Sequence, residues 1–207
     1  MDKIILTPDD SKVKKIKNKD KKFKELVEMV GEIEIALDNN YFSSLVQAIV
    51  GQQLSMKAAE TIWNRVISLL GEVNFDNILN TSDEDLKSVG LSRSKVIYVK
   101  DLAQKFRDKT INIDEIDKLE DEDIVNELIK VKGIGRWTAE MFLIFSLGRM
   151  DVFSMQDLGL KKSVQWLYNL PDLPSNDFLK ELSDKFKPYR TILSLYLWGA
   201  INKGIIK

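Results

Sequence analysis

Two features of this sequence could carry chemistry, a glycine turn and a carboxylate that follows it. Gly133 and Gly135 flank one isoleucine in a tight turn that opens an apolar helix at about Arg136. Glycine lets the backbone approach a ligand closely, and the free N–H groups at a helix start attract anions such as phosphate. Asp157 lies beyond that helix and the loop after it. The pattern predicts a phosphate-binding turn near a carboxylate that acts on the bound substrate.

The residue types that are missing narrow the chemistry. The 207 residues contain no Cys and no His, which excludes thiol nucleophiles, imidazole bases, disulfides and zinc or iron–sulfur sites built from these ligands. Acid–base chemistry near neutral pH must rest on Asp, Glu, Lys or Tyr. The formal net charge of −1 argues against a basic coat over the whole surface. It allows a local basic face, because a few phosphate contacts suffice to bind nucleic acid.

The elements that must position these residues are helices. Apolar residues recur three and four positions apart along most of the chain, as on the buried face of a helix. Helices are expected over residues 23–37, 41–70 with a break near 51–55, about 82–89, 94–106, 121–131, 136–147, 157–170, 176–186 and 191–202. Ser55 and Ser82 are placed to cap two of them. No run alternates like a half-buried strand, so we expect an all-α protein.

No segment of the sequence reads as a membrane or export signal. The apolar runs are shorter than the about 18–20 residues that cross a bilayer, and the N-terminus has no signal-peptide pattern. We expect a cytoplasmic protein without a membrane partner. The lysine-rich residues 12–24 are either an arm that touches DNA phosphates or a solvated helix face or mobile leader.

Three separated blocks of sequence identify a family resemblance. They are residues 49–55 (IVGQQLS), 131–139 (VKGIGRWTA) and 151–157 (DVFSMQD), and a weaker fourth block is residues 187–190 (KPYR) leading to Trp198. In this order and spacing they resemble the helix–hairpin–helix superfamily of base-excision DNA glycosylases, most closely the 3-methyladenine DNA glycosylase II (AlkA) type. The resemblance covers the chain from about residue 41 to its end.

The resemblance implies how the chain is divided. It implies two helical lobes around a cleft, one from about residues 40–150 with the hairpin at 121–147, and one from about residues 1–39 plus 151–207. Longer bacterial members carry an extra N-terminal α/β domain, and we expect none here because only about 40 residues precede the first block. One lesion needs one pocket, so we expect a monomer.

The resemblance also implies the reaction. Asp157 falls on the catalytic aspartate of the family, and a helix N-cap is a second role compatible with it. Trp137 stands where glycosylases that also cut the DNA backbone carry a lysine, which forms a Schiff base with the sugar. Without that amine the implied reaction is hydrolysis of the N-glycosidic bond, with no lyase step.

Further roles follow from matching positions. Gln53 sits at the position of the wedge that fills the gap left by a flipped base, with Leu54 as its apolar support. The implied base-pocket residues are Trp137, Trp198, Met141 and Leu158. The implied phosphate-binding residues are Lys132, Gly133, Gly135, Arg136 and Trp137. No catalytic metal is expected, but a structural Na⁺ or K⁺ is implied at the hairpin through the backbone carbonyls of Ile129, Val131 and Ile134.

Together these roles imply a monofunctional glycosylase that flips alkylated purines, such as 3-methyladenine and 7-methylguanine, out of damaged double-stranded DNA. Met141 and Leu158 stand where the AlkA type carries tyrosines, so the pocket is less aromatic and its specificity can differ. Two alternatives stay open. One is a glycosylase for deaminated bases such as hypoxanthine or uracil, and the other is a non-catalytic helix–hairpin–helix module that only binds DNA.

Overall fold

The computed structural model describes residues 2–206, apart from the side chain of residue 114. Contacts within this range divide the chain into two compact units. The terminal unit comprises residues 1–37 and 143–207, and the central unit comprises residues 38–142. The sequence placed the divisions at about 40 and 150, whereas the second one falls inside helix α9 (Arg136–Phe145).

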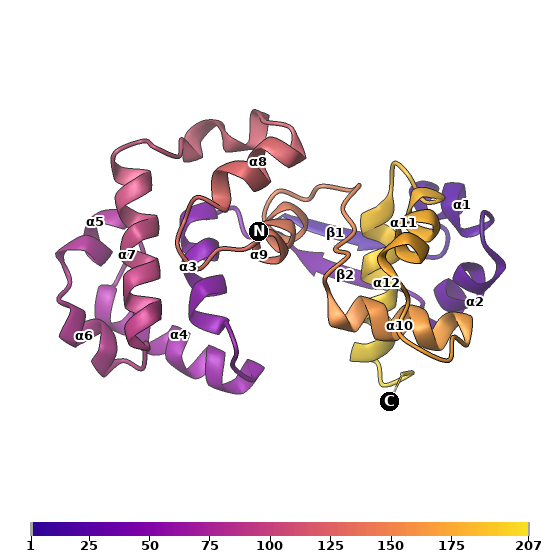
Figure 1. The fold of residues 1–207 in the computed structure, drawn as a ribbon, viewed down its shortest axis with the longest axis horizontal. Coiled ribbons are helices and arrows are strands. Elements are labelled where there is room, and N and C mark those ends of the chain that lie inside the picture. The colour runs from indigo at the N-terminus through magenta and orange to yellow at the C-terminus, as the bar shows by residue number, and fades with distance from the viewer. Residues whose placement is uncertain (1, 207) are drawn as a thin grey trace. The chain divides into compact units, whose positions relative to one another are not determined.

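The terminal unit is built around one helix. Its elements are β1 (Lys3–Leu6), α1 (Ser11–Lys17), α2 (Lys21–Val30), β2 (Ile33–Ala36), α10 (Leu158–Tyr168), α11 (Asn176–Asp184) and α12 (Arg190–Asn202). Helix α12 packs against α2, α10, α11 and β2 (Figure 1). Because neighbours cover it on several sides, its middle is apolar around most of its circumference, from Ile192 to Leu197.

The central unit is a helical array in which several helices pack against α7. Its elements are α3 (Tyr41–Gly51), α4 (Met56–Leu70), α5 (Phe75–Asn80), α6 (Asp83–Ser88), α7 (Arg93–Arg107), a 3-10 helix (Ile113–Lys118), α8 (Asp121–Leu128) and the first part of α9. Helix α7 packs against α3, α5 and α6. The predicted caps are confirmed, since Ser55 accepts from the N–H of Ala58 and Ser82 from that of Asp85.

The expectation of a mostly helical protein is confirmed, but the expectation of no strands is wrong. β1 and β2 form an antiparallel pair with Ile4 opposite Ile35. The helix predicted over residues 23–37 ends at Val30, because Gly31 turns the chain with a φ of +70°. The strand that follows alternates over only four residues, which is too short to be distinguished from helical spacing. Within residues 2–206 no helix has the length and apolarity to cross a bilayer.

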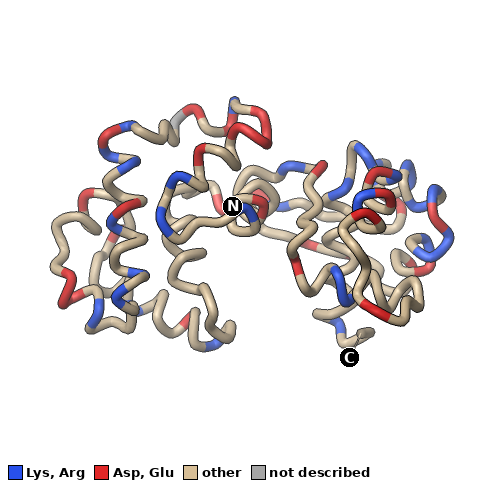
Figure 2. The backbone as a smooth tube through the Cα atoms, viewed as in Figure 1, with Lys and Arg blue, Asp and Glu red and all other residues tan. Residues whose placement is uncertain are grey.

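The lysine-rich segment 12–24 forms α1 and the start of α2, and Figure 2 shows blue Lys and Arg positions along this part of the chain. Several of its ammonium groups bind carbonyls of the same unit. Lys17 donates to Pro8 O at 2.9 Å, and Lys22 donates to Leu167 O, in the last turn of α10, at 2.9 Å. These lysines therefore stabilise the fold, a role that neither interpretation of the segment had included.

Candidate functional site

Asp157 begins helix α10 as its N-cap, as the sequence predicted. Its Oδ1 atom accepts the N–H of Leu160 at 2.7 Å and the indole N–H of Trp198 at 3.2 Å. The residue is only 9% exposed. A carboxylate can be buried when strong donors satisfy it, and both bonds end on a charged acceptor. The structure thus fixes the direction of this carboxyl group.

The loop before Asp157 is tied to the first turn of α12. Asp151 and Arg190 form a two-pronged ion pair, with N–O distances of 2.9 and 3.0 Å. The hydroxyl of Thr191 accepts the N–H of Val152 at 2.9 Å. The ion pair of Asp151 therefore positions this loop. Together with the Thr191 bond it fixes the loop that leads to Asp157 against α12, the helix that carries Trp198.

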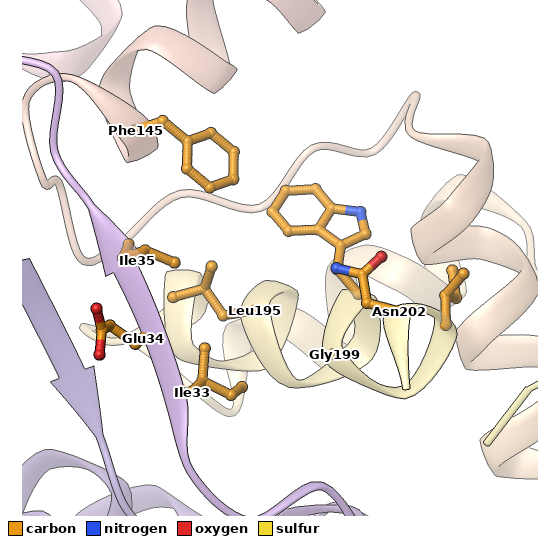
Figure 3. A pocket seen from close by; sticks show the side chains of 9 residues that line it. Ile33, Glu34, Ile35, Phe145, Leu195, Gly199 and Asn202 are labelled. Atoms are coloured by element: carbon orange, nitrogen blue, oxygen red, sulfur yellow. The ribbon is translucent and has the colours of Figure 1, made fainter. Parts of the chain in front are cut away.

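A cavity of about 270 Å³ lies in the terminal unit beside this tryptophan. It is lined by Ile33, Glu34, Ile35, Phe145, Leu195, Trp198, Gly199, Ile201 and Asn202. The rings of Phe145 and Trp198 have centroids 5.9 Å apart and are tilted by 32°. Figure 3 shows the ring of Phe145 on one side of the cavity and Ile35 and Leu195 on another. The volume is near the lower end for small-molecule pockets, about 300 Å³, which suits one heterocyclic ring system.

The other predicted pocket residues do not line this cavity. Leu158 directly follows Asp157 and is 54% exposed. Trp137 and Met141 lie one turn apart on α9 in the central unit, and Trp137 is 44% exposed. The structure therefore brings Asp157 and Trp198 together and leaves the remaining predicted pocket residues outside the cavity described here.

Sequence reasoning missed Phe145. Its signal is its position on α9, four residues after Met141 and so on the same side of the helix as that predicted pocket residue. Its partner Trp198 lies 53 residues further on, so the ring pair depends on tertiary packing of α9 against α12. No local pattern links the two.

The glycine turn between α8 and α9 is packed from one side. Gly133 has a φ of +81°, and a Cβ atom built on it would lie 2.1 Å from Cδ2 of Tyr98. Only glycine fits there. A Cβ on Gly135 would meet no atom within 4 Å. Ile134 between them is buried, so the turn is anchored by its middle residue while its glycine backbone stays close to the surface.

The basic side chains at this turn have acidic neighbours. Arg136 forms a two-pronged ion pair with Glu122 and lies 3.6 Å from a carboxylate oxygen of Glu140. The pairing with Glu122 raises the pKa of the Arg136 guanidinium. Lys132 donates its backbone N–H to Asp101 at 2.9 Å and keeps its side chain largely exposed. A phosphate arriving here would compete with Glu122 for Arg136.

The predicted wedge stands on a strained turn. Gln53 follows the end of α3 with a φ of +58°, a left-handed conformation that a residue with a side chain adopts at a cost of about 1–2 kcal/mol. Gln53 and Leu54 are both exposed. Strain of this kind is concentrated at functional sites. The preceding residue, Gln52, donates its amide to the carbonyl of Gly133 at 2.8 Å, so this turn and the glycine turn are in direct contact.

Residues 46–188 match the family described as HhH-GPD superfamily base excision DNA repair protein. This chain belongs to that superfamily. The matched range contains the wedge turn, the glycine turn and Asp157.

Individual members of the HhH-GPD superfamily are similar over most of the chain. A putative DNA-3-methyladenine glycosylase, YfjP, of Bacillus subtilis is 31% identical over 176 residues, which is 81% of this chain and 61% of the relative. The chain thus spans about three fifths of the length of that relative. The crystal structure of a DNA-3-methyladenine glycosidase from Bacillus halodurans is 36% identical with a TM-score of 0.87, covering 95% of this chain and 92% of the other.

A third HhH-GPD relative has been solved with nucleic acid. The 3-methyladenine DNA glycosylase of Schizosaccharomyces pombe, in complex with abasic DNA, is 32% identical with a TM-score of 0.78. The match covers 88% of this chain and 92% of that chain. The likeness extends over both compact units of the present chain.

Proposed function

We propose that this protein is a monofunctional DNA glycosylase that removes alkylated purines, such as 3-methyladenine and 7-methylguanine, from double-stranded DNA. The observation that carries the proposal is the buried carboxylate of Asp157, which is held by the indole of Trp198 at the wall of an aromatic cavity. Membership of a base-excision repair superfamily and relatives named 3-methyladenine glycosylases support it. We further infer that it acts as a monomer in the cytoplasm.

The base must first leave the DNA stack. Extrusion costs a few kcal/mol, and it costs least for a damaged or mispaired base. Phe145 and Trp198 then offer aromatic faces on which the flipped base stacks. An alkylated purine carries positive charge, so each favourable face adds about 0.5–2 kcal/mol of cation–π attraction. A neutral base gains no such term, which is how this cavity would select alkylated purines.

Bond cleavage then needs a negative charge near the sugar. As the C1′–N bond breaks, its electron pair goes to the base and positive charge develops on the sugar, as in other glycoside hydrolyses. The fixed carboxylate of Asp157 stabilises that charge. Water adds to C1′ and its proton is released to solvent. A cationic base leaves as a neutral molecule, so no general acid is required, in keeping with a chain without His.

The remaining predicted residues would hold the DNA. The exposed turn of Gln53 and Leu54 would fill the gap left by the base, and the N–H groups after Gly133 would bind a phosphate. Trp137 supplies no amine, so we propose that the reaction stops at the abasic site.

We also propose that the hairpin binds a monovalent cation through backbone carbonyls. The carbonyl of Val131 accepts the N–H of Ile134 at 3.1 Å, and a carbonyl oxygen has a second lone pair. The carbonyls of Ile129, Val131 and Ile134 would hold Na⁺ or K⁺, which would attract a DNA phosphate. Within residues 2–206 no group of three or more acidic side chains is placed to hold a metal ion.

The deciding experiment is a base-release assay on four DNA duplexes that carry 3-methyladenine, 7-methylguanine, hypoxanthine or uracil. We expect release of the two alkylated purines while the DNA strands stay intact. The strands should break only when alkali is added to cleave the abasic site. Release of uracil or hypoxanthine alone would establish a glycosylase for deaminated bases. Binding without release of any base would establish a DNA-binding module.

The indole N–H of Trp198 can be tested separately from its ring. Trp198→Phe keeps an aromatic face at the cavity but removes the bond to Asp157. A hydrogen bond to a charged group contributes about 1.5–3 kcal/mol, so we expect kcat to fall about tenfold or more with a smaller change in KM. Steady-state base release at several substrate concentrations measures both quantities.

The matched control is Trp166→Phe, which alters a tryptophan on α10 that does not line the cavity. This control should keep kcat within about twofold. An equal loss in both variants would show that the Trp198 bond does not position the carboxylate.

A further inference from the structure

Helix α7 presents three side chains to the two turns that the proposed function assigns to DNA. They are Lys95, Tyr98 and Asp101, spaced three residues apart and therefore on one face of the helix. Lys95 Nζ donates to the carbonyl of Val50 at 2.7 Å and to that of Gln52 at 2.8 Å. Carbonyls at a helix C-terminus lack partners within the helix. Lys95 satisfies one carbonyl in the last turn of α3 and one at the first residue of the wedge turn (residues 52–54).

The next two side chains on this face hold the hairpin turn (residues 131–135). The ring of Tyr98 packs so closely against Gly133 that no Cβ atom fits between them. Asp101 Oδ2 accepts the backbone N–H of Lys132 at 2.9 Å. Burial by itself would raise the pKa of Asp101, but its hydrogen bonds from Lys105 and Lys132 lower it. The carboxylate therefore stays charged as an acceptor for the hairpin.

The wedge turn and the hairpin turn also touch each other. The amide of Gln52 donates to the carbonyl of Gly133 at 2.8 Å. The two turns lie 81 residues apart in sequence at this contact. Side-chain to backbone hydrogen bonds therefore link α7 to the wedge turn, the wedge turn to the hairpin turn, and the hairpin turn back to α7.

Placing the charged Lys95 against these carbonyls has a desolvation cost. Burial lowers the pKa of its ammonium group, because the charged form is partly removed from water. The ion pairs found within residues 2–206 include none of Lys95 with a carboxylate. Its two carbonyl bonds are what offset that cost, and both fall on the stretch that leads into the wedge.

We propose that Lys95, Tyr98 and Asp101 make α7 a splint that fixes the wedge turn relative to the hairpin turn, with Lys95 as the main positioning residue. This inference rests on the proposed function. A phosphate held at the hairpin sets the position of the DNA, and the splint then sets where Gln53 enters the stack. Catalytic geometry tolerates little error, since a displacement of about 1 Å can cost about 100-fold in rate.

The test compares Lys95→Met with Lys100→Met in the full chain. Lys100 lies on the same helix and its ammonium group pairs with Asp83 at 2.8 Å, so both variants lose one lysine charge from α7. Three quantities are measured: affinity for a duplex with a tetrahydrofuran abasic analogue, affinity for the undamaged duplex, and fluorescence of 2-aminopurine placed beside the lesion to report flipping.

We expect Lys95→Met to weaken binding to the abasic duplex about tenfold or more and to suppress the flipping signal, because the wedge is displaced. Affinity for the undamaged duplex, which depends on phosphate contacts, should stay within about twofold. Lys95→Arg should recover most of the loss, since a guanidinium can donate to both carbonyls. Lys100→Met should behave as the unaltered protein.

Equal abasic-duplex affinity and flipping in Lys95→Met and Lys100→Met would overturn the splint. Equal losses on damaged and undamaged duplexes would also overturn it, because they would indicate a phosphate contact. Gln52→Met provides a second variant at the surface, where unfolding is not expected, and it should cause a loss of the same kind. Failure of the unaltered protein to release any base would refute the proposed function. The binding and flipping measurements would still test the splint, because they do not depend on base release.

Discussion

Asp157→Asn is expected to lower the single-turnover rate of base release about 100- to 1,000-fold, the range found when one preorganised electrostatic group is removed from an active site. The substitution suits this site because an amide oxygen can still accept the N–H of Leu160 and the indole N–H of Trp198. Asparagine caps helices as well as aspartate does. The free energy of unfolding should therefore change by less than about 1 kcal/mol.

Thermal melts and a single-turnover assay on a 3-methyladenine duplex measure the two quantities. Asp172→Asn makes the same charge change on an exposed loop and should leave both unaltered. Full base release by Asp157→Asn would remove this carboxylate from the mechanism. A large loss of stability would show that its charge serves the fold more than the reaction.

Several local features of this site were predictable because their causes are local. The positive φ of Gly133 favours glycine by itself, and glycine flanked by helical spacing signals such a turn. Ser55, Ser82 and Asp157 cap the helices that follow them, and each side chain accepts a backbone N–H three residues ahead. Patterns of this length are visible in a sequence.

Other features depend on contacts between distant segments. The short strand at residues 33–36 is stabilised by its pairing with residues 3–6, and its four residues give no periodicity of their own. Helix α5 (Phe75–Asn80) was not predicted, because six residues are too few for a clear apolar stripe. The bonds from Lys95 reach 43 and 45 residues back along the chain. Lysine spacing on a helix surface reveals nothing of such a target.

The contacts also change how the basic residues of this chain are interpreted. Lys22 and Lys95 both donate to carbonyls at the ends of helices, where they complement the negative end of the helix dipole. Arg136 is paired with Glu122 at the hairpin. The phosphate binding that we propose at the hairpin would therefore rest on backbone N–H groups more than on the guanidinium of Arg136, and the conformation of Gly133 sets the direction of those groups.

Gly133→Ala is accordingly expected to lower the free energy of unfolding by about 2–5 kcal/mol. A Cβ atom 2.1 Å from the ring of Tyr98 forces the turn or the ring to move, and overpacking of this kind costs about 1–3 kcal/mol. The φ of +81° adds about 1–2 kcal/mol for a residue with a side chain. Because the turn moves, the affinities for undamaged and for damaged duplex DNA should both fall. Denaturant titration and binding assays measure these effects.

Gly135→Ala is the matched control, since its Cβ would meet no atom within 4 Å, and it should change stability by less than about 0.5 kcal/mol. The cause can be separated further with Tyr98→Ala. In that background the overlap is gone, so Gly133→Ala should cost only the about 1–2 kcal/mol of its backbone conformation. A coupling energy of about 1–3 kcal/mol in this double-mutant cycle is the expected signature of the contact. Additive effects of the two substitutions would mean that Tyr98 does not support the hairpin. Tyr98 would then not be one of the residues through which α7 fixes that turn.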